Sequence, residues 1–336
     1  MSPPLAAGRR SFLGACAAAL AVAVLAPRAR AEGAGVETLD LEPMDPRRKR
    51  TVPMRLHLPR VVGPSGQPGQ PLRAPLVVFS HGIGGSRMGY SYLGRHWASH
   101  GVASLHVQHV GSDRSLWGAG NLFSLVSRLQ QAAQESEAID RVHDLRFALD
   151  HVLEGATGER LDARRVVAAG HSYGANTTLL AAGAQVFRDG RAVDLREPRL
   201  QGAIVISAPP FYGETGEMPR ILAPVRLPSL HITCTDDDIR IPGYYSGLAD
   251  RLAVFEAVSG PRKTLAVFQG GSHSIFTDRS GPGGLELNQR IKAATRELTL
   301  GFLRSVFDGE HQGLQEWPQR HAGLLARYVP GPLTTA

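Results

Sequence analysis

The sequence is poor in cysteine, since its 336 residues include only Cys16 and Cys234. Cys16 lies in an N-terminal stretch interpreted below as a cleaved signal, so Cys234 would be the only thiol of the mature chain. A single thiol excludes an intramolecular disulfide. The sequence also lacks H-E-x-x-H and C-x-x-C patterns, and its scattered histidines have no ligand spacing. We therefore predict no metal site.

Long apolar runs are also scarce. The run Ala15–Ala26 has about a dozen residues, whereas a membrane-spanning helix needs about 20, and no later run is long enough. Arg9 and Arg10 precede this run, and the small-x-small sequence Ala29-Arg30-Ala31 follows it. This order predicts a twin-arginine signal peptide over residues 1–31, export to the periplasm or the medium, and no membrane span after cleavage. A membrane-anchoring helix is the alternative interpretation.

A large excess of positive charge is absent from the predicted mature chain. The formal net charge of +7 falls to +3 without residues 1–31, which carry four arginines and no acidic residue. Nucleic acid is therefore not expected as a partner. One basic run, Arg47-Arg48-Lys49-Arg50, precedes a strand-like segment. We predict a solvated turn there rather than a binding patch.

What the chain does contain is an alternation of strand-like and helix-like runs over most of the roughly 305 residues after the signal. Continuous apolar runs predict buried strands at Pro75–Ser80, Val102–Val110, Arg165–Ala169, Gln201–Ser207, Leu230–Cys234 and Leu265–Gln269. Periodic patterns predict helices at Tyr90–His100, Ser136–Leu153, Ala175–Ala184 and Leu285–Phe307. We expect one α/β domain over residues 32–310, with a mostly parallel central sheet flanked by helices, and a partly ordered tail over residues 311–336.

The motif Gly170-His171-Ser172-Tyr173-Gly174 lies between a predicted strand and a predicted helix. In this context G-x-S-x-G is typical of a nucleophile elbow, in which the serine lies at a sharp, strained turn. Glycines two residues on either side let the strand and the helix approach without clashing β-carbons. We therefore predict that Ser172 is a catalytic nucleophile and that the Tyr173 amide faces a developing oxyanion.

A second glycine-lined turn, Phe79–Gly85, follows an earlier predicted strand. Its Ile83 amide would supply the second oxyanion donor beside that of Tyr173. His81 lies in the same turn and is predicted to brace it rather than to act as a base. The turn lacks the third glycine of a dinucleotide-binding fingerprint, so no cofactor is predicted.

A serine nucleophile needs a base, and the best-placed histidine is His273, in Gly-Ser-His-Ser directly after the strand that ends at Gln269. The other histidines considered lie inside predicted strands or helices, where packed or solvated histidines are usual. We predict that His273 is the base that activates Ser172.

The acid that orients this base should follow another strand end, and Asp236, Asp237 and Asp238 follow Cys234. Counting from the strand end selects Asp237. The distance to Pro242 favours Asp238 instead, so the choice stays open, with Asp237 preferred.

Together these motifs resemble the dienelactone hydrolase and platelet-activating-factor acetylhydrolase branch of the α/β hydrolases. The resemblance extends over about Val77–Phe307 and rests on Phe-Ser-His-Gly-Ile-Gly, on the elbow, on the acidic loop and on the late Gly-Ser-His. It implies an α/β-hydrolase fold, esterase or lipase-like activity, the residues named above as the triad, and backbone oxyanion donors at Ile83 and Tyr173. Dienelactone hydrolases often carry a cysteine nucleophile where this chain has Ser172, so their particular substrate is not implied.

Two segments rich in apolar side chains, Gly111–Gln134 and Pro209–Tyr212, follow predicted strands and are interpreted as lid-like insertions. Ligands of open α/β sheets bind at this edge, so Trp117, Phe211 and Tyr212 are expected to form part of a pocket wall. The expected function is hydrolysis of a small, neutral, moderately hydrophobic carboxylic ester through an acyl-enzyme. An amidase or peptidase with the same triad is the alternative, and a non-catalytic binding module of the same fold is a further one.

Overall fold

The computed structural model describes Met1 and residues 35–60, 73–118, 122–188, 191–212, 215–241, 243–279 and 284–332. The predicted signal peptide, residues 1–31, lies outside this part of the chain except for Met1, and it stays a prediction. None of the helices in the described ranges combines the length and the apolar character that crossing a membrane requires.

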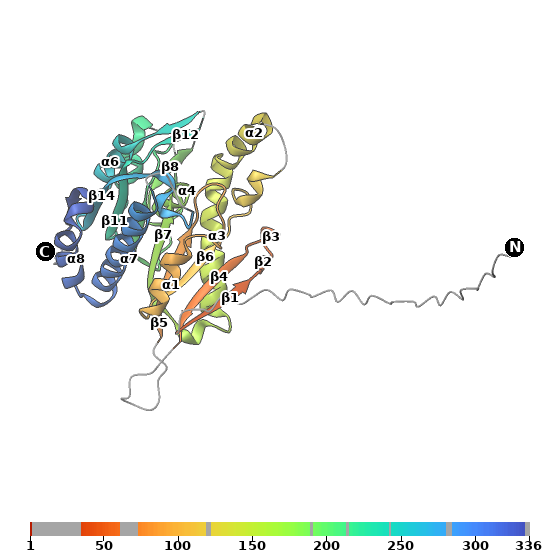
Figure 1. Cartoon of the computed structure of the whole chain (residues 1–336), viewed down its shortest axis with the longest axis horizontal. Coiled ribbons are helices and arrows are strands. Elements are labelled where there is room, and N and C mark those ends of the chain that lie inside the picture. Colours follow the sequence, from red (N-terminus) through yellow and green to blue (C-terminus); the bar gives the residue numbers. More distant parts are fainter. Residues whose placement is uncertain are drawn as a thin grey trace, which may run out of the picture. The chain divides into compact units, whose positions relative to one another are not determined.

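The core of the molecule is a nine-stranded sheet with the order β1-β4-β6-β5-β7-β10-β11-β14-β15 (Figure 1). Its strands are β1 (Val36–Leu41), β4 (Met54–Pro59), β5 (Ala74–Ser80), β6 (Ala103–Val107), β7 (Leu161–His171), β10 (Leu200–Ile206), β11 (Ser229–Asp236), β14 (Lys263–Ser272) and β15 (Leu325–Val329). The strands from β6 to β14 are parallel, and antiparallel pairs close both edges. Short pairs lie outside it: β2 (Met44–Asp45) with β3 (Arg50–Thr51), β8 (Gln185–Arg188) with β9 (Arg191–Asp194), and β12 (Ile239–Ile241) with β13 (Tyr244–Ser246).

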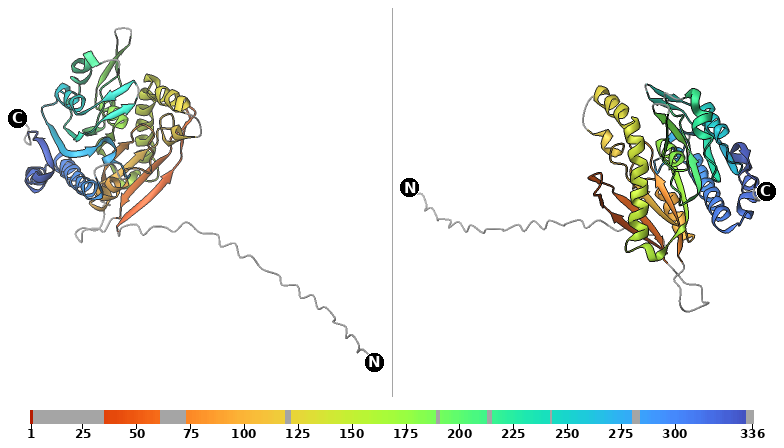
Figure 2. Two further views of the ribbon diagram at one scale, coloured as in Figure 1. Left: turned by 45° about the horizontal axis from the view of Figure 1, so that its top comes forward. Right: turned by 180° about the vertical axis from the view of Figure 1, so that it is seen from behind.

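Helices cover both faces of this sheet (Figures 1 and 2). One face carries α3 (Glu135–Glu154), α4 (Tyr173–Ala181), α5 (Met218–Leu222) and α6 (Leu248–Ala257), and the other carries α1 (Ser91–Ser99), α7 (Gly284–Asp308) and α8 (Gln312–Arg320). Neighbouring strand residues enter different cores, because side chains alternate along a strand. Val78 packs in the first core and Val77 in the second. This alternation explains why the central strands are apolar throughout.

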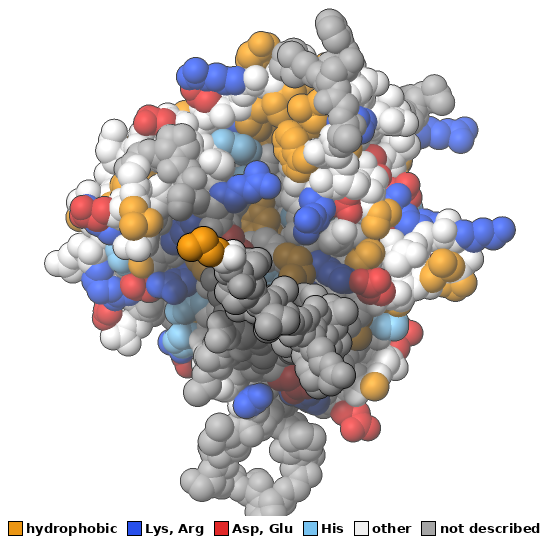
Figure 3. All heavy atoms as spheres, turned by 45° about the vertical axis from the view of Figure 1, so that its right-hand side comes forward, with side chains coloured by type: hydrophobic (Ala, Val, Ile, Leu, Met, Phe, Trp, Pro, Cys, Tyr) orange, Lys and Arg blue, Asp and Glu red, His pale blue; other side chains and the backbone are white. Residues whose placement is uncertain are grey.

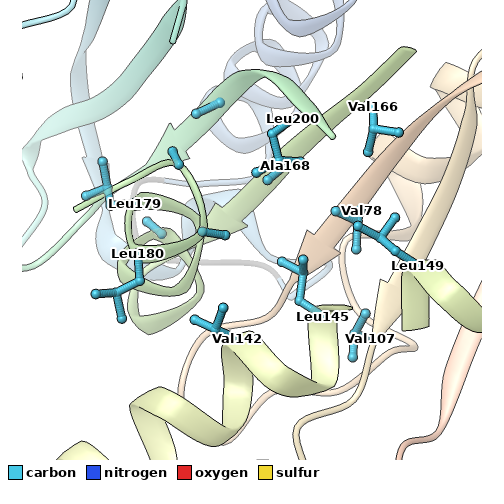
Figure 4. Close-up of a cluster of buried hydrophobic side chains, with 14 of the residues drawn as sticks. Val78, Val107, Val142, Leu145, Leu149, Val166, Ala168, Leu179, Leu180 and Leu200 are labelled. Carbon is cyan, nitrogen blue, oxygen red and sulfur yellow. The ribbon is translucent and has the colours of Figure 1, made fainter. Parts of the chain in front are cut away.

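Figure 4 shows how α3 packs on the sheet. Its buried residues Val142, Leu145 and Leu149 recur at helical spacing and face Val78 and Val166 of the strands. The mostly parallel sheet flanked by helices is therefore confirmed, and each of the buried strands predicted above is present.

The end of the chain differs from the expectation of a partly ordered tail. Residues 311–329 contain α8 and β15, and β15 pairs antiparallel with β14 as the last strand of the sheet. Trp317 is fully buried and its indole N–H donates to the Ala294 carbonyl of α7. Pro318 inside α8 weakened the helical pattern in the sequence, and the partners of this segment lie far away along the chain.

The basic run forms the predicted turn over residues 46–49, but the side chains of Arg48 and Arg50 are half-buried rather than fully solvated. Arg48 Nη2 and Arg50 Nε lie 2.8 and 3.1 Å from Oδ1 of Asp144, which is buried on α3. These ion pairs join the β2–β3 hairpin to the helix. On the face shown in Figure 3, Lys and Arg side chains lie interspersed with Asp and Glu.

Candidate active site

Ser172 lies at the turn between β7 and α4, with φ 56° and ψ −125°. These angles are strained for a residue with a side chain, as expected of a nucleophile elbow. A β-carbon at Gly170 would lie 2.1 Å from the Gly174 carbonyl oxygen, and one at Gly174 would lie 1.9 Å from that of Ser80. Both flanking glycines are thus required by the close approach of strand and helix.

The structure brings Ser172, His273 and Asp237 together from three strand ends. His273 Nε2 lies 2.8 Å from Ser172 Oγ, and His273 Nδ1 lies 2.6 Å from Asp237 Oδ1. Because the carboxylate accepts a hydrogen bond from Nδ1–H, Nε2 carries no proton and is free to accept that of the serine. Parallel strands end at the same edge of the sheet, which is why residues 101 positions apart meet here.

Asp237 is the one of the three adjacent aspartates that contacts His273. It is fully buried, and Thr233 Oγ1 donates to its second oxygen at 2.7 Å. Burial alone would raise the pKa of Asp237, but the charge and hydrogen bond of His273, with the nearby Arg251, hold that pKa well below its usual value. Asp236 and Asp238 instead bond to Thr235 and Arg240 near the surface.

The two predicted oxyanion donors lie in segments that flank Ser172. A β-carbon at Gly82 would lie 3.1 Å from the β-carbon of Ser172, so the Phe79–Gly85 turn passes directly beside Ser172. Neither the Ile83 nor the Tyr173 N–H group donates a hydrogen bond to another described residue. Tyr173 is also the first residue of α4, where backbone N–H groups favour a developing anion.

A buried chain of hydrogen bonds that sequence reasoning missed connects this turn to His273. The Gly82 N–H donates to Tyr90 Oη, the Tyr90 hydroxyl donates to His171 Nδ1, and His171 Nε2 donates to the His273 carbonyl. Burial, followed by the charge of His273, lowers the pKa of His171 to about 3, so this imidazole is neutral at ordinary pH. His171 lies beside the serine in the elbow motif, and its position there was the available signal.

Arg141 of α3 is a second support that the sequence analysis missed. It is fully buried, it donates to the His81 carbonyl, and its guanidinium carbon lies 4.5 Å from the centroid of the Tyr173 ring. It therefore contacts both segments that carry the predicted oxyanion donors. Its spacing of four residues before Leu145 places it on the buried face of the helix, and this spacing was the signal that would have found it.

The other two guanidinium bonds of Arg141 go to Ser112 Oγ at 2.7 Å and to Thr177 Oγ1 at 2.8 Å. His81 braces the same turn, as predicted, since its Nδ1 donates to the Gly82 carbonyl and its Nε2 accepts from the His109 amide. The Phe79–Gly85 turn, called the oxyanion turn below for its predicted role, is thus held by side chains from several elements.

A cavity opens beside Ser172 and is lined mainly by apolar side chains, among them Ile83, Leu129, Leu180, Leu195, Phe211 and Ile241. Two of the three predicted pocket residues, Phe211 and Tyr212, line it. No Arg or Lys is found among the described residues of its wall. Over the described ranges there is likewise no cluster of three or more His, Cys, Asp or Glu residues suited to a metal ion.

Trp117 does not line this cavity and lies instead on the outer side of the oxyanion turn. Its indole N–H donates to the Gly84 carbonyl at 2.8 Å, and the side chain is about half exposed. The predicted insertion Gly111–Gln134 around it contains a helix, α2 (Leu122–Ala132), and α2 contributes Leu129 to the wall.

The nine-stranded sheet, its two helical layers and the strand-to-helix elbow define the α/β-hydrolase fold. Solved structures that share it include two esterases. A ferulic acid esterase from Streptomyces cinnamoneus aligns with a TM-score of 0.56 and 22% identity, over 87% of this chain and 94% of that one. A cold-adapted esterase from an Arctic intertidal metagenomic library aligns with a TM-score of 0.51 and 18% identity, over 80% of this chain and 95% of that one. At these identities the likeness concerns the fold.

The profile of the family described as platelet-activating factor acetylhydrolase, isoform II, matches residues 65–119. This segment includes the oxyanion turn and ends before the elbow, and the match agrees with the resemblance drawn from the motifs. A search of the curated proteins finds no significant match to the sequence.

Proposed function

We propose that the protein is a serine hydrolase that cleaves carboxylic esters through an acyl-enzyme. The observation that carries this proposal is the pair of contacts joining Ser172, His273 and Asp237, at 2.8 and 2.6 Å. Nucleophile, base and orienting acid are already within hydrogen-bonding distance, as acyl transfer requires.

In the proposed reaction Ser172 Oγ attacks the ester carbonyl carbon while His273 Nε2 takes the hydroxyl proton. Asp237 holds the imidazole and stabilises its positive charge. The Ile83 and Tyr173 N–H groups donate to the oxyanion of the tetrahedral intermediate. His273 then gives its proton to the leaving alcohol, and water repeats the sequence to release the acid.

A neutral, moderately hydrophobic ester is the proposed substrate class. The wall of the cavity is largely apolar, and burial of each acyl methylene contributes about 0.8 kcal/mol. Both structural neighbours are esterases, and the matching family is described as an acetylhydrolase. These descriptions favour an ester over an amide, which the same residues would also be able to attack.

The test is hydrolysis of p-nitrophenyl esters with acyl chains of two to eight carbons, beside a matched p-nitroanilide. We expect the esters to be cleaved, with kcat/KM rising from acetyl toward hexanoyl, and the anilide to be cleaved far more slowly. Faster cleavage of the anilide would replace the proposal by an amidase. Absence of turnover on every ester would refute it.

We also propose that the protein is exported after folding. The paired Arg9-Arg10 and the Ala29-Arg30-Ala31 site support twin-arginine export. The thiol of Cys234 is compatible with an oxidising compartment, because it is buried and burial raises its pKa well above the usual value. Cell fractionation of the wild type and of a variant carrying Arg9→Lys and Arg10→Lys tests this, since the variant should stay in the cytoplasm.

A further inference from the structure

The cavity beside Ser172 contains a buried polar atom without a partner. Asn176 lines the cavity and is only 7% exposed, and its Oδ1 accepts no hydrogen bond from the described residues. The hydroxyl groups of Tyr173 and Tyr212, in the same wall, donate to backbone carbonyls. A buried acceptor without a donor is costly, and Oδ1 is enclosed by protein atoms. Rotation of the side-chain amide to turn Oδ1 toward the cavity would let a ligand supply the missing donor.

The position of Asn176 along α4 defines where such a donor would lie. Ser172 precedes the helix, and Asn176 and Leu180 follow at intervals of four residues, so all three lie on one side of α4. Asn176 is thus about one turn, or about 6 Å, along the helix axis from Ser172. Beyond it the wall is aliphatic, with Leu180, Val186 and Leu195.

We propose that this cavity selects an acyl group that carries a hydroxyl within a few bonds of the scissile carbonyl, followed by an apolar chain. The hydroxyl donates to Asn176 Oδ1, and the chain packs against the aliphatic wall beyond it. The inference rests on the proposed ester hydrolysis at Ser172 and adds the substrate class.

Two other kinds of polar group fit the cavity less well. An amide N–H would bring a carbonyl with it, which the side chains of Leu180, Val186 and Leu195 cannot pair. A carboxylate would find no Arg or Lys among the described lining residues, and it would approach Glu135 in the same wall. A hydroxyl supplies the missing donor without adding a buried charge.

The experiment compares p-nitrophenyl esters of hexanoate, 3-hydroxyhexanoate, 6-hydroxyhexanoate and 3-methoxyhexanoate, with each 3-substituted acid as separate enantiomers. The methoxy ester matches the 3-hydroxy ester in its electronic effect on the carbonyl but cannot donate a hydrogen bond. We expect kcat/KM for one of the hydroxy esters to exceed that for the methoxy ester by about fivefold or more, the effect of one neutral hydrogen bond.

The variant Asn176→Leu removes the acceptor while keeping a side chain of similar size. It should abolish the preference for the hydroxy ester while retaining cleavage of the hexanoate ester. Tyr212→Phe is the matched control, because it removes a hydroxyl from the same wall that already has partners, and the preference should persist.

Equal kcat/KM for the hydroxy and methoxy esters in the wild type would overturn the inference, whether or not the Asn176 variant folds. A preference that survives Asn176→Leu would overturn it as well. If all four esters are cleaved alike, the proposed ester hydrolysis stands and the inference alone fails. If none is cleaved, the proposed function itself fails.

Discussion

The two sides of the cavity are built differently. We call Ser172, His273 and Asp237 with the Phe79–Gly85 turn the proposed catalytic floor, or floor, and α2 with the β12–β13 hairpin the pocket roof. The floor lies on the strand ends of the main sheet, and its polar groups are held by buried hydrogen bonds.

The roof has far less support. The buried residues of α2, Leu129 and Ala132, belong to a small separate cluster with Leu116, against which the half-buried Ile241 of the hairpin packs. Figure 2 shows the hairpin beside α2. The proposed reacting groups thus lie on well-packed elements of the main sheet, whereas the proposed acyl-binding wall includes a segment with a smaller core of its own.

Removal of the nucleophile should have the largest effect on the floor. Ser172→Ala is expected to lower ester hydrolysis by about 10⁴-fold or more and to leave the fold intact, because the remaining groups cannot form an acyl-enzyme. Steady-state kinetics and circular dichroism measure the two parts. A fluorophosphonate should label the wild type at Ser172 and should not label the variant; a folded, active variant would exclude this mechanism.

Substitution of the proposed orienting acid should have the next largest effect on the rate. Asp237→Asn is expected to lower kcat by about 10⁴-fold, because the amide no longer holds His273 in the required tautomer. Asp236→Asn and Asp238→Asn are the controls and should stay within a few-fold of the wild type, since neither residue contacts His273. A severe loss for Asp238→Asn would transfer the role to that residue.

Substitution of Arg141 tests whether the contacts of its side chain hold the two predicted oxyanion donors in place. Arg141→Met should lower kcat by about 10- to 100-fold with a smaller change in KM, because the two oxyanion donors are then less well aimed. Arg141→Lys should retain part of the rate. Arg146→Met, on the same helix but outside the site, should behave like the wild type. If KM rises while kcat is kept, Arg141 does not position the donors.

On the substrate side, Phe211→Ala should lower kcat/KM for the hexanoyl ester by about tenfold while sparing the acetyl ester, because only the longer chain loses apolar contact. Trp117→Ala is the comparison and should leave the dependence on chain length unchanged, since Trp117 does not line the cavity. Unfolding must be followed for both variants, because Phe211 is also part of the core. Opposite behaviour of the two variants would place the acyl chain on the other side of the oxyanion turn.

Protonation of His171 should make the folded protein less stable at acidic pH. Its pKa is about 3 in the folded protein and about 6.5 when unfolded, so below pH 6.5 the unfolded chain binds more protons. The free energy of unfolding should therefore fall from about pH 6.5 downward. Denaturant titrations should show a slope smaller by up to about 1.4 kcal/mol per pH unit in His171→Gln; equal slopes would mean that His171 is not buried in its neutral form.

Much of the candidate site was predictable, because its residues lie in local motifs. The elbow, the oxyanion turn and His273 each follow a recognisable strand, and parallel strands must end at a common edge. The acid stayed open between Asp237 and Asp238 because the count from the strand end and the distance to Pro242 favoured different residues. The contact that separates them, between Asp237 and His273, joins elements 36 residues apart and is not visible in either local pattern.

The sequence by itself determined the order of strands and helices, the apolar character of the sheet and the chemical types of the reacting residues, since these depend on neighbours along the chain. Only the tertiary structure decided which distant residues support them. Arg141 meets the His81 carbonyl across 60 residues, His171 meets His273 across 102, and β15 closes the sheet from the end of the chain. Such contacts arise from the packing of whole elements, so a pattern within one element cannot specify them.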